Sequence, residues 1–368
     1  MSLPGTHPWF AHHSADSALV RAYQGERPHH QPVWFMRQAG RSLPEYRELR
    51  QGTSMLDSCL RPEMAAEITC QPVRRHGVDA GIFFSDIVIP MRLAGVGVDI
   101  TPGVGPVVDH PIRTDDDVEA LLATSADDFE AALEPIREAV SLTVAELGSI
   151  PLIGFCGAPF TVASYLVEGG PSREQLRTRS MMLSRPDLWH RLASWVADRS
   201  GRFLRAQVLA GASAVQLFDS WAGSLCVATY RSLVQQHSAA VFDHISDLPV
   251  PRVHFGIHTS ELLVAMREAG ASVMGVDHRL DLAEANRRLG ASTPLQGNLD
   301  PAVLFTTEAA RRTAVEEVLT AGRGAPGHVV NLGHGVPKDA DPGVLTDLVV
   351  TIHELGSVKD FGSTKDKA

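Results

Sequence analysis

Eight short apolar runs recur along the 368-residue chain, and longer segments of helical composition separate them. The runs lie at residues 32–36, 80–84, 151–155, 214–218, 252–256, 272–276, 293–297 and 328–332. Buried strands that alternate with helices pair in parallel through right-handed crossovers, and eight such units close into a barrel. The pattern therefore predicts a single α/β domain, a (β/α)8 TIM barrel, although an open doubly wound sheet would show the same alternation.

Polar or glycine-rich residues follow nearly every run directly. They read RQAGR, SDIVIP, CGAPFT, DSWAG, IHTS, DHR, NLDP and GHGVP in chain order. In a barrel the carboxyl ends of all strands meet at one rim, where active sites form. We therefore expect the functional residues at the C-terminal rim of the strands.

The barrel is expected to span residues 21–356, between a flexible N-terminal segment (1–20) and a polar C-terminal tail (357–368). Residues 91–125 are rich in Gly, Pro and Asp, so we expect an insertion there that forms a hairpin near the rim.

Composition restricts the class of partner. The net charge is -10, which argues against a nucleic-acid-binding or anionic-membrane surface. No apolar run reaches the length of a membrane span, and the first residues lack the pattern of a secretory signal, so a cytoplasmic location is expected. The four cysteines are far apart and read as free thiols: Cys59, Cys70, Cys156 and Cys226.

The loop after the first run is locally basic in an acidic chain. Residues 36–50 hold four arginines against two glutamates, and Gly40 separates Arg37 from Arg41. Guanidinium forks bind carboxylates in a bidentate manner, so the loop at the rim indicates a carboxylate-binding site. The alternative is the start of an amphipathic helix with solvated arginines.

Four further residues stand at the expected rim. Asp86 follows an apolar run, where a helix cap or a buried ion pair is the plainer interpretation. Tyr165 lies on the helix after a Gly-Ala-Pro turn, where a core role is common. Ser220 precedes a predicted helix and is a candidate N-cap, and His334 lies between two glycines that would let a ligand approach.

These motifs resemble those of the uroporphyrinogen decarboxylase family from about Trp34 to Asp341. The matching runs include PVWFMRQAGRSLPEYRELR, FSDI, GFCGAPFTVASYLVEGG, LFDSWAG and NLGHG, with departures at Ser42 and His278.

The resemblance implies an enzyme that removes CO2 from the four acetate arms of uroporphyrinogen III and yields coproporphyrinogen III in haem and porphyrin biosynthesis. It also implies a homodimer, Asp86 and Arg37 as catalytic residues, and Asp86 bound to the pyrrole N–H groups. The implied substrate contacts are Arg37, Gln38, Ala39, Gly40, Arg41, Asp86, Tyr165, Ser220 and His334.

A decarboxylase needs an electron sink, but the sequence has no dinucleotide-binding, P-loop or HExxH motif. We therefore expect neither cofactor nor metal, with the protonated pyrrole ring of the substrate as the sink.

Two other functions remain open. A zinc methyltransferase on a similar barrel would need a thiolate-bearing metal site, for which His254, His258 and Cys226 are the available residues. A tetrapyrrole carrier would use the same arginines for binding alone.

Overall fold

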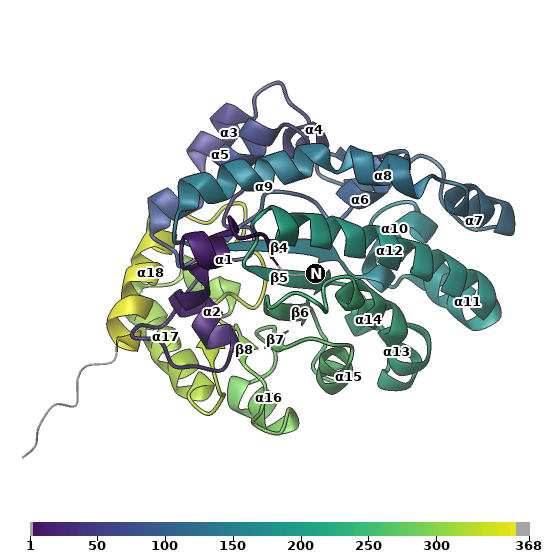
Figure 1. Cartoon of the computed structure of the whole chain (residues 1–368). Coiled ribbons are helices and arrows are strands. Elements are labelled where there is room, and N and C mark those ends of the chain that lie inside the picture. Colours follow the sequence, from purple (N-terminus) through teal and green to yellow (C-terminus); the bar gives the residue numbers. More distant parts are fainter. Residues whose placement is uncertain (1–2, 358–368) are drawn as a thin grey trace, which may run out of the picture.

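A curled parallel sheet lies at the centre of the molecule, and helices surround it (Figure 1). The computed structural model describes residues 3–357. The seven strands pair in chain order: β1 (Gly81–Ile82), β4 (Leu152–Gly157), β5 (Ala214–Asp219), β6 (Arg252–Gly256), β7 (Val273–Gly275), β8 (Leu295–Gln296) and β9 (His328–Val329). A doubly wound sheet reverses its strand order, so this order confirms the predicted TIM-barrel-like architecture.

The predicted first strand is wrong in one respect, because residues 32–36 do not form a regular strand. They lie between β9 and β1, where the ring of regular strands is open, and make one parallel bridge from Val33 to Val330. The N–H groups of Phe35 and Met36 are donated instead to side chains, those of Gln38 (2.9 Å) and Asn331 (3.1 Å). Side-chain acceptors thus replace the strand ladder just before the rim loop.

The longer helices form the outer layer around the sheet. They are α5 (Pro62–His76), α9 (Glu134–Leu147), α10 (Pro159–Glu168), α11 (Leu176–Ser184), α12 (Pro186–Ala210), α14 (Gln235–Asp243), α17 (Glu308–Gly322) and α18 (Pro342–Gly356). Shorter helices complete the layer: α1 (Pro8–Ala11), η1 (Ser14–Asp16), α2 (Ala18–Tyr23), α3 (Pro44–Leu49), α4 (Met55–Cys59), α6 (Ile89–Leu93), α7 (Asp115–Leu122), α8 (Ala126–Ala132), η2 (Ala222–Ser224), α13 (Val227–Leu233), α15 (Leu263–Glu268), α16 (Leu282–Arg288) and η3 (Pro301–Phe305).

Helix α5 illustrates why the outer helices begin and end where they do. Pro62 occupies its first turn, where a missing N–H costs nothing, and three basic residues lie in its last turn. Gly77 ends it in the left-handed conformation, at φ 65°.

The N-terminal residues pack against the end of the barrel where the strands begin. His7 Nε2 lies 2.8 Å from the Val208 carbonyl oxygen, and the hydroxyls of Ser14 and Ser213 are 2.7 Å apart. Residues 3–20, which the sequence suggested as a separate flexible segment, are thus in contact with the barrel in this structure. Most of the predicted polar tail, residues 358–368, lies outside the described residues.

The insertion forms the predicted hairpin. Strands β2 (Val98–Thr101) and β3 (Gly105–Val108) pair antiparallel. Backbone hydrogen bonds from Val108 to Gly169 (3.1 Å) and from Ile112 to Leu166 (3.0 Å) dock it on the end of α10. The four cysteines are free, and Cys226 alone among them is exposed. No helix within residues 3–357 is long and apolar enough to cross a membrane.

Candidate active site at the C-terminal rim

The loop after residues 32–36 turns sharply at Arg37, which has a positive φ of 62°. The left-handed residue of this loop is thus Arg37 and not the glycine, Gly40. Gly40 has a different function, because a Cβ there would lie 3.1 Å from the Arg37 carbonyl oxygen. A non-glycine residue in this region carries strain that the surrounding structure must hold in place.

Gln38 holds the turn from inside. Its Oε1 accepts the Phe35 N–H and its Nε2 donates to the Ala80 carbonyl, both at 2.9 Å. Gln38 is fully buried, so its side chain braces the loop and does not face a ligand. Ala39 and Gly40 are half-buried beside it.

The side-chain stem of Arg37 lies against Gly335. A Cβ on Gly335 would come within 2.5 Å of Arg37 Cδ and 2.8 Å of Cγ. The glycine after His334 therefore makes room for the arginine. This close approach joins the loop after residues 32–36 to the loop after β9.

Asp86 lies beyond the carboxyl end of β1 and is partly buried. Its Oδ1 accepts the Val88 N–H at 3.1 Å. Burial raises the pKa of Asp86, and the Val88 N–H, the positive charge of Arg37 and the Ile87 N–H lower it in part. Burial is the larger effect because it removes water from the carboxylate.

Tyr165 stacks on Trp221 from the neighbouring strand-end loop. The ring centroids are 4.0 Å apart and the planes are inclined by 28°. Burial and the negative charge of Asp86 raise the pKa of Tyr165 to about 12, against a smaller opposite effect of Arg37. The phenol therefore keeps its proton at neutral pH and remains a hydrogen-bond donor.

Thr161 ties α10 to the loop after β5. Its hydroxyl donates to Asp219 Oδ1 (2.8 Å) and accepts the Trp221 N–H (3.2 Å). Both partners flank Ser220 in the sequence, so Thr161 sets the path of the chain at that serine. No helix-capping hydrogen bond from a side chain occurs at the start of η2, where Trp221 is the N-cap. Ser220 is thus not an N-cap, and it is half-buried.

The imidazole of His334 is oriented by the backbone N–H of the next residue, Gly335. Its Nδ1 accepts the Gly335 N–H at 2.7 Å, which leaves the proton of a neutral imidazole on Nε2. Burial lowers the pKa of His334, and so do the charges of Arg37, His278 and Arg279. At neutral pH the side chain is therefore an uncharged donor.

The structure brings four predicted residues into one electrostatic group. Arg37 acts on Asp86, Tyr165 and His334, and Asp86 acts on Tyr165. Arg41 is exposed and is not among the charges that act on these residues. The sequence interpretation missed Trp221 and Thr161, although Trp221 belongs to the same DSWAG motif as Ser220.

Known proteins support a family assignment. The family model described as uroporphyrinogen decarboxylase (URO-D) matches residues 14–355. A uroporphyrinogen decarboxylase from Arthrobacter sp. (strain FB24) is 63% identical over 342 residues, which cover 93% of this chain and 98% of that protein. One from Leifsonia xyli subsp. xyli (strain CTCB07) is 57% identical and covers 96% of this chain and 98% of that protein.

The chain belongs to the uroporphyrinogen decarboxylase family. The resemblance found in the sequence motifs is thereby confirmed over most of its length.

Solved structures share the fold of this uroporphyrinogen decarboxylase family member. A methyltransferase from Methanosarcina mazei has a TM-score of 0.76 at 20% identity, covering 91% of this chain and 97% of that chain. A B12-independent methionine synthase from Shewanella sp. W3-18-1 has a TM-score of 0.51 at 10% identity, covering 88% and 95%. At these identities the likeness concerns the fold alone.

The residues considered for a thiolate zinc site are dispersed. His254 is fully buried on β6 with Nδ1 3.2 Å from the Met266 carbonyl oxygen, whereas Cys226 is exposed. Within residues 3–357, the His, Cys, Asp and Glu side chains grouped closely enough to share a metal ion are His30, Asp79 and His353, without a cysteine. The ligand set that a thiol-activating zinc enzyme needs is therefore not assembled at the rim of this family member.

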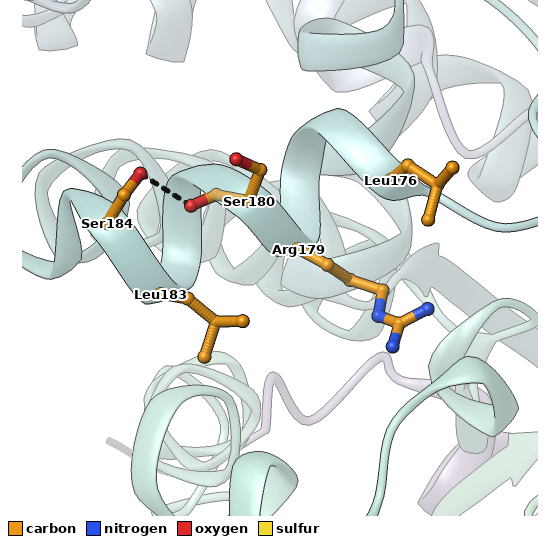
Figure 2. A pocket seen from close by; sticks show the side chains of 5 residues that line it. All are labelled: Leu176, Arg179, Ser180, Leu183 and Ser184. Atoms are coloured by element: carbon orange, nitrogen blue, oxygen red, sulfur yellow. Dashed lines mark hydrogen bonds between the residues drawn. The ribbon is translucent and has the colours of Figure 1, made fainter.

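A hollow on the outer surface lies on α11 and is lined by Leu176, Arg179, Ser180, Leu183 and Ser184 (Figure 2). None of these residues is among the predicted rim residues. The hollow is therefore separate from the candidate active site of this chain.

Proposed function

We propose that this chain is a uroporphyrinogen decarboxylase that converts uroporphyrinogen III to coproporphyrinogen III by removing CO2 from four acetate arms. The observation that carries the proposal is the group at the rim, in which the charge of Arg37 acts on Asp86, Tyr165 and His334. A carboxylate and a guanidinium that lie within electrostatic range of each other match a substrate that carries both pyrrole N–H donors and carboxylate arms.

The substrate ring supplies the electron sink. Protonation of the pyrrole at the ring carbon adjacent to the one that bears the acetate arm makes the ring cationic and leaves the arm conjugated with it. The bond to the carboxylate carbon then breaks, its electron pair enters the ring and CO2 leaves. A proton added to the remaining methylene carbon gives the methyl group, and loss of the first proton from the ring carbon restores the neutral pyrrole. No cofactor enters this sequence of steps, and we infer that the enzyme uses none.

Asp86 is suited to stabilise the cationic ring. Burial raises the pKa of Asp86, which means that its ionised carboxylate is incompletely stabilised when no substrate is bound. A positive charge that develops on an adjacent pyrrole provides the missing partner, and most strongly in the transition state. Interactions that strengthen at that stage accelerate the reaction.

The remaining residues bind and orient the substrate. We infer that Arg37 and Arg41 hold carboxylate arms other than the one that reacts, because a bidentate grip on the departing carboxylate would stabilise the ground state. His334 Nε2 and the Tyr165 hydroxyl are uncharged donors for further carboxylates. Ser220 and the backbone of residues 38–40 complete the proposed contacts.

Two further properties extend the proposal. We infer a homodimer, as the family resemblance implies, and a cytoplasmic location, in keeping with the four free cysteines.

The test is an anaerobic incubation of the purified chain, without added cofactor, with freshly reduced uroporphyrinogen III. Products are then oxidised and separated by their number of carboxylates. Porphyrins with seven, six, five and four carboxylates are expected. An unchanged eight-carboxylate porphyrin, from folded protein that still binds it, would favour the carrier function. The Asp86→Asn variant separates the two functions further, because in an enzyme it should lose turnover and retain binding.

A further inference from the structure

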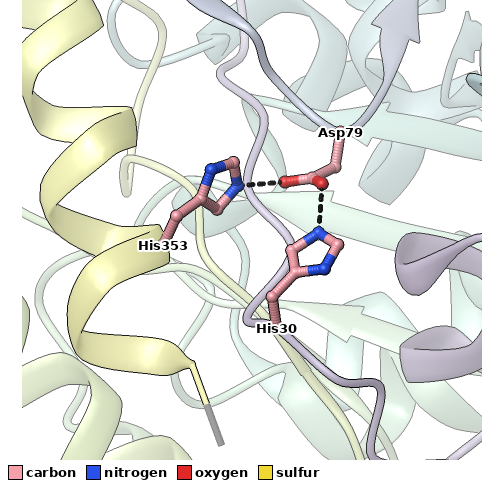
Figure 3. Close-up of side chains that lie close together, drawn as sticks. All are labelled: His30, Asp79 and His353. Carbon is pink, nitrogen blue, oxygen red and sulfur yellow. Dashed lines mark hydrogen bonds and ion pairs between the residues drawn. The ribbon is translucent and has the colours of Figure 1, made fainter.

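Three side chains from distant parts of the sequence converge on one another at the edge of the barrel. His30 Nε2 lies 2.6 Å from Asp79 Oδ1, and His353 Nε2 lies 2.8 Å from Asp79 Oδ2 (Figure 3). The two imidazole rings approach edge to face with centroids 5.1 Å apart. The three potential ligand atoms all lie within 4.8 Å of one another.

The cluster is separate from the active site. Asp79 precedes β1, whereas Asp86 follows it, so the two carboxylates lie toward opposite ends of that strand. His30 precedes residues 32–36, and His353 lies in the last turn of α18. The cluster therefore belongs to the end of the barrel where the strands begin.

We propose that His30, Asp79 and His353 bind a divalent transition-metal ion of the zinc class. Two imidazole nitrogens and one carboxylate oxygen form a ligand set that binds such ions in preference to magnesium or calcium, because those two ions favour oxygen ligands alone. The ion would take the position of the two protons that now lie between the imidazoles and the carboxylate.

Access and charge at the cluster both suit an ion. The side chains of His30 and His353 are 41% and 31% exposed, so an ion can enter and water can complete its coordination. The groups that act on the Asp79 carboxylate are the two imidazoles and the Val33 N–H, with no lysine or arginine among them. No lysine or arginine among these groups thus competes with an ion for the Asp79 carboxylate.

The position indicates what a bound ion would do. Asp79 is bonded twice to the segment that lies between β9 and β1: its Oδ2 accepts the Val33 N–H at 2.8 Å, and its own N–H donates to the Val33 carbonyl at 2.9 Å. An ion shared with His353 would tie α18 to this segment, where the ring of regular strands is open. It would stabilise the folded state without contributing to catalysis.

The experiment uses the full-length chain after treatment with a chelator. Zinc is titrated by calorimetry, and the melting temperature is measured with zinc and with magnesium. One zinc ion per chain and a zinc-dependent rise in Tm of a few degrees are expected. Cobalt(II) should give the visible absorption of a site with nitrogen and oxygen ligands, a readout that needs no variant. Zinc should leave decarboxylation unchanged.

The variants His30→Gln and His353→Gln should each abolish the zinc-dependent rise in Tm, measured against their own metal-free form. The matched control is His13→Gln, because His13 is an exposed histidine paired with a carboxylate elsewhere, Asp16 at 3.5 Å. It should retain the full rise. Zinc binding that survives in the double variant His30→Gln/His353→Gln, no rise in the parent chain, or an equal rise with magnesium would each overturn the proposal.

Discussion

The phenol of Tyr165 and the indole of Trp221 are stacked at 4.0 Å between centroids, although the two residues follow different strands. Tyr165 lies on α10 and Trp221 follows β5. The contact therefore fixes the position of a predicted ligand residue by means of a residue from a separate part of the rim. It also links Tyr165 to the residue that follows Ser220.

Replacement of Trp221 by Leu should release the Tyr165 ring. An aromatic pair contributes about 0.5–1.5 kcal/mol beyond its buried area, so kcat/KM should fall roughly 3- to 10-fold. Steady-state kinetics would measure the effect. Trp9→Leu, which alters a partly buried tryptophan on α1, is the control and should leave kcat/KM unchanged. Equal losses in both variants would indicate a general effect on folding.

Asp86→Asn should lose most activity and gain stability at neutral pH. The folded-state pKa of Asp86 is raised, so ionisation at pH 7 costs more in the folded than in the unfolded chain. Removal of the charge should stabilise the fold by about 1 kcal/mol, measured as a higher Tm. The gain should shrink as pH falls through the raised pKa of Asp86, because the carboxyl of the parent chain then becomes protonated as well. A lower Tm at pH 7 would contradict the argument.

The acid limb of the pH dependence of kcat/KM should reflect the ionisation of Asp86, and it should shift when Arg37 is replaced. Because the pKa of Asp86 is raised, its ionised form should be lost at a pH above that of an ordinary aspartate. The charge of Arg37 lowers this pKa, so Arg37→Gln should move the limb to still higher pH and reduce kcat/KM roughly 10- to 100-fold. Measurements of kcat/KM between pH 4 and 8 would show both effects.

Arg41→Gln is the matched control from the same loop. Arg41 is not among the charges that act on Asp86. The acid limb of kcat/KM should therefore stay at the same pH in this variant, even if substrate binding weakens. A shift of the limb in this variant would assign the electrostatic effect to the whole loop.

Tyr23→Phe should destabilise the barrel interior. The buried Tyr23 hydroxyl donates to Gln296 Oε1 at 2.5 Å and accepts the Trp34 Nε1–H at 3.0 Å. Its removal leaves both partners unsatisfied, so the free energy of unfolding should fall by about 1–3 kcal/mol. Denaturant unfolding would measure the loss. Tyr46→Phe, which alters a hydroxyl in a part-exposed contact with Arg50, should cost less.

The sequence alone was enough to predict the architecture and part of the rim. Alternating apolar runs predicted the parallel ring, and the residues after them predicted where the functional group lies. Arg37, Asp86, Tyr165 and His334 are far apart in sequence, yet each follows an expected strand, so a barrel had to bring them to one end. Gln38 was also predicted as a substrate contact, but its side chain braces the turn from inside.

Local patterns determined these features because the spacing of apolar residues reflects the period of a strand or helix within one segment. Other features were decided by the tertiary structure. Residues 32–36 are not a regular strand because the side chains of Gln38 and Asn331 take the N–H groups of Phe35 and Met36. The pKa of Asp86 rises because burial exceeds the effect of Arg37. The stacking of Tyr165 on Trp221 and the cluster at Asp79 join distant segments. Burial and competition for hydrogen bonds depend on which segments meet, and only the folded chain fixes that.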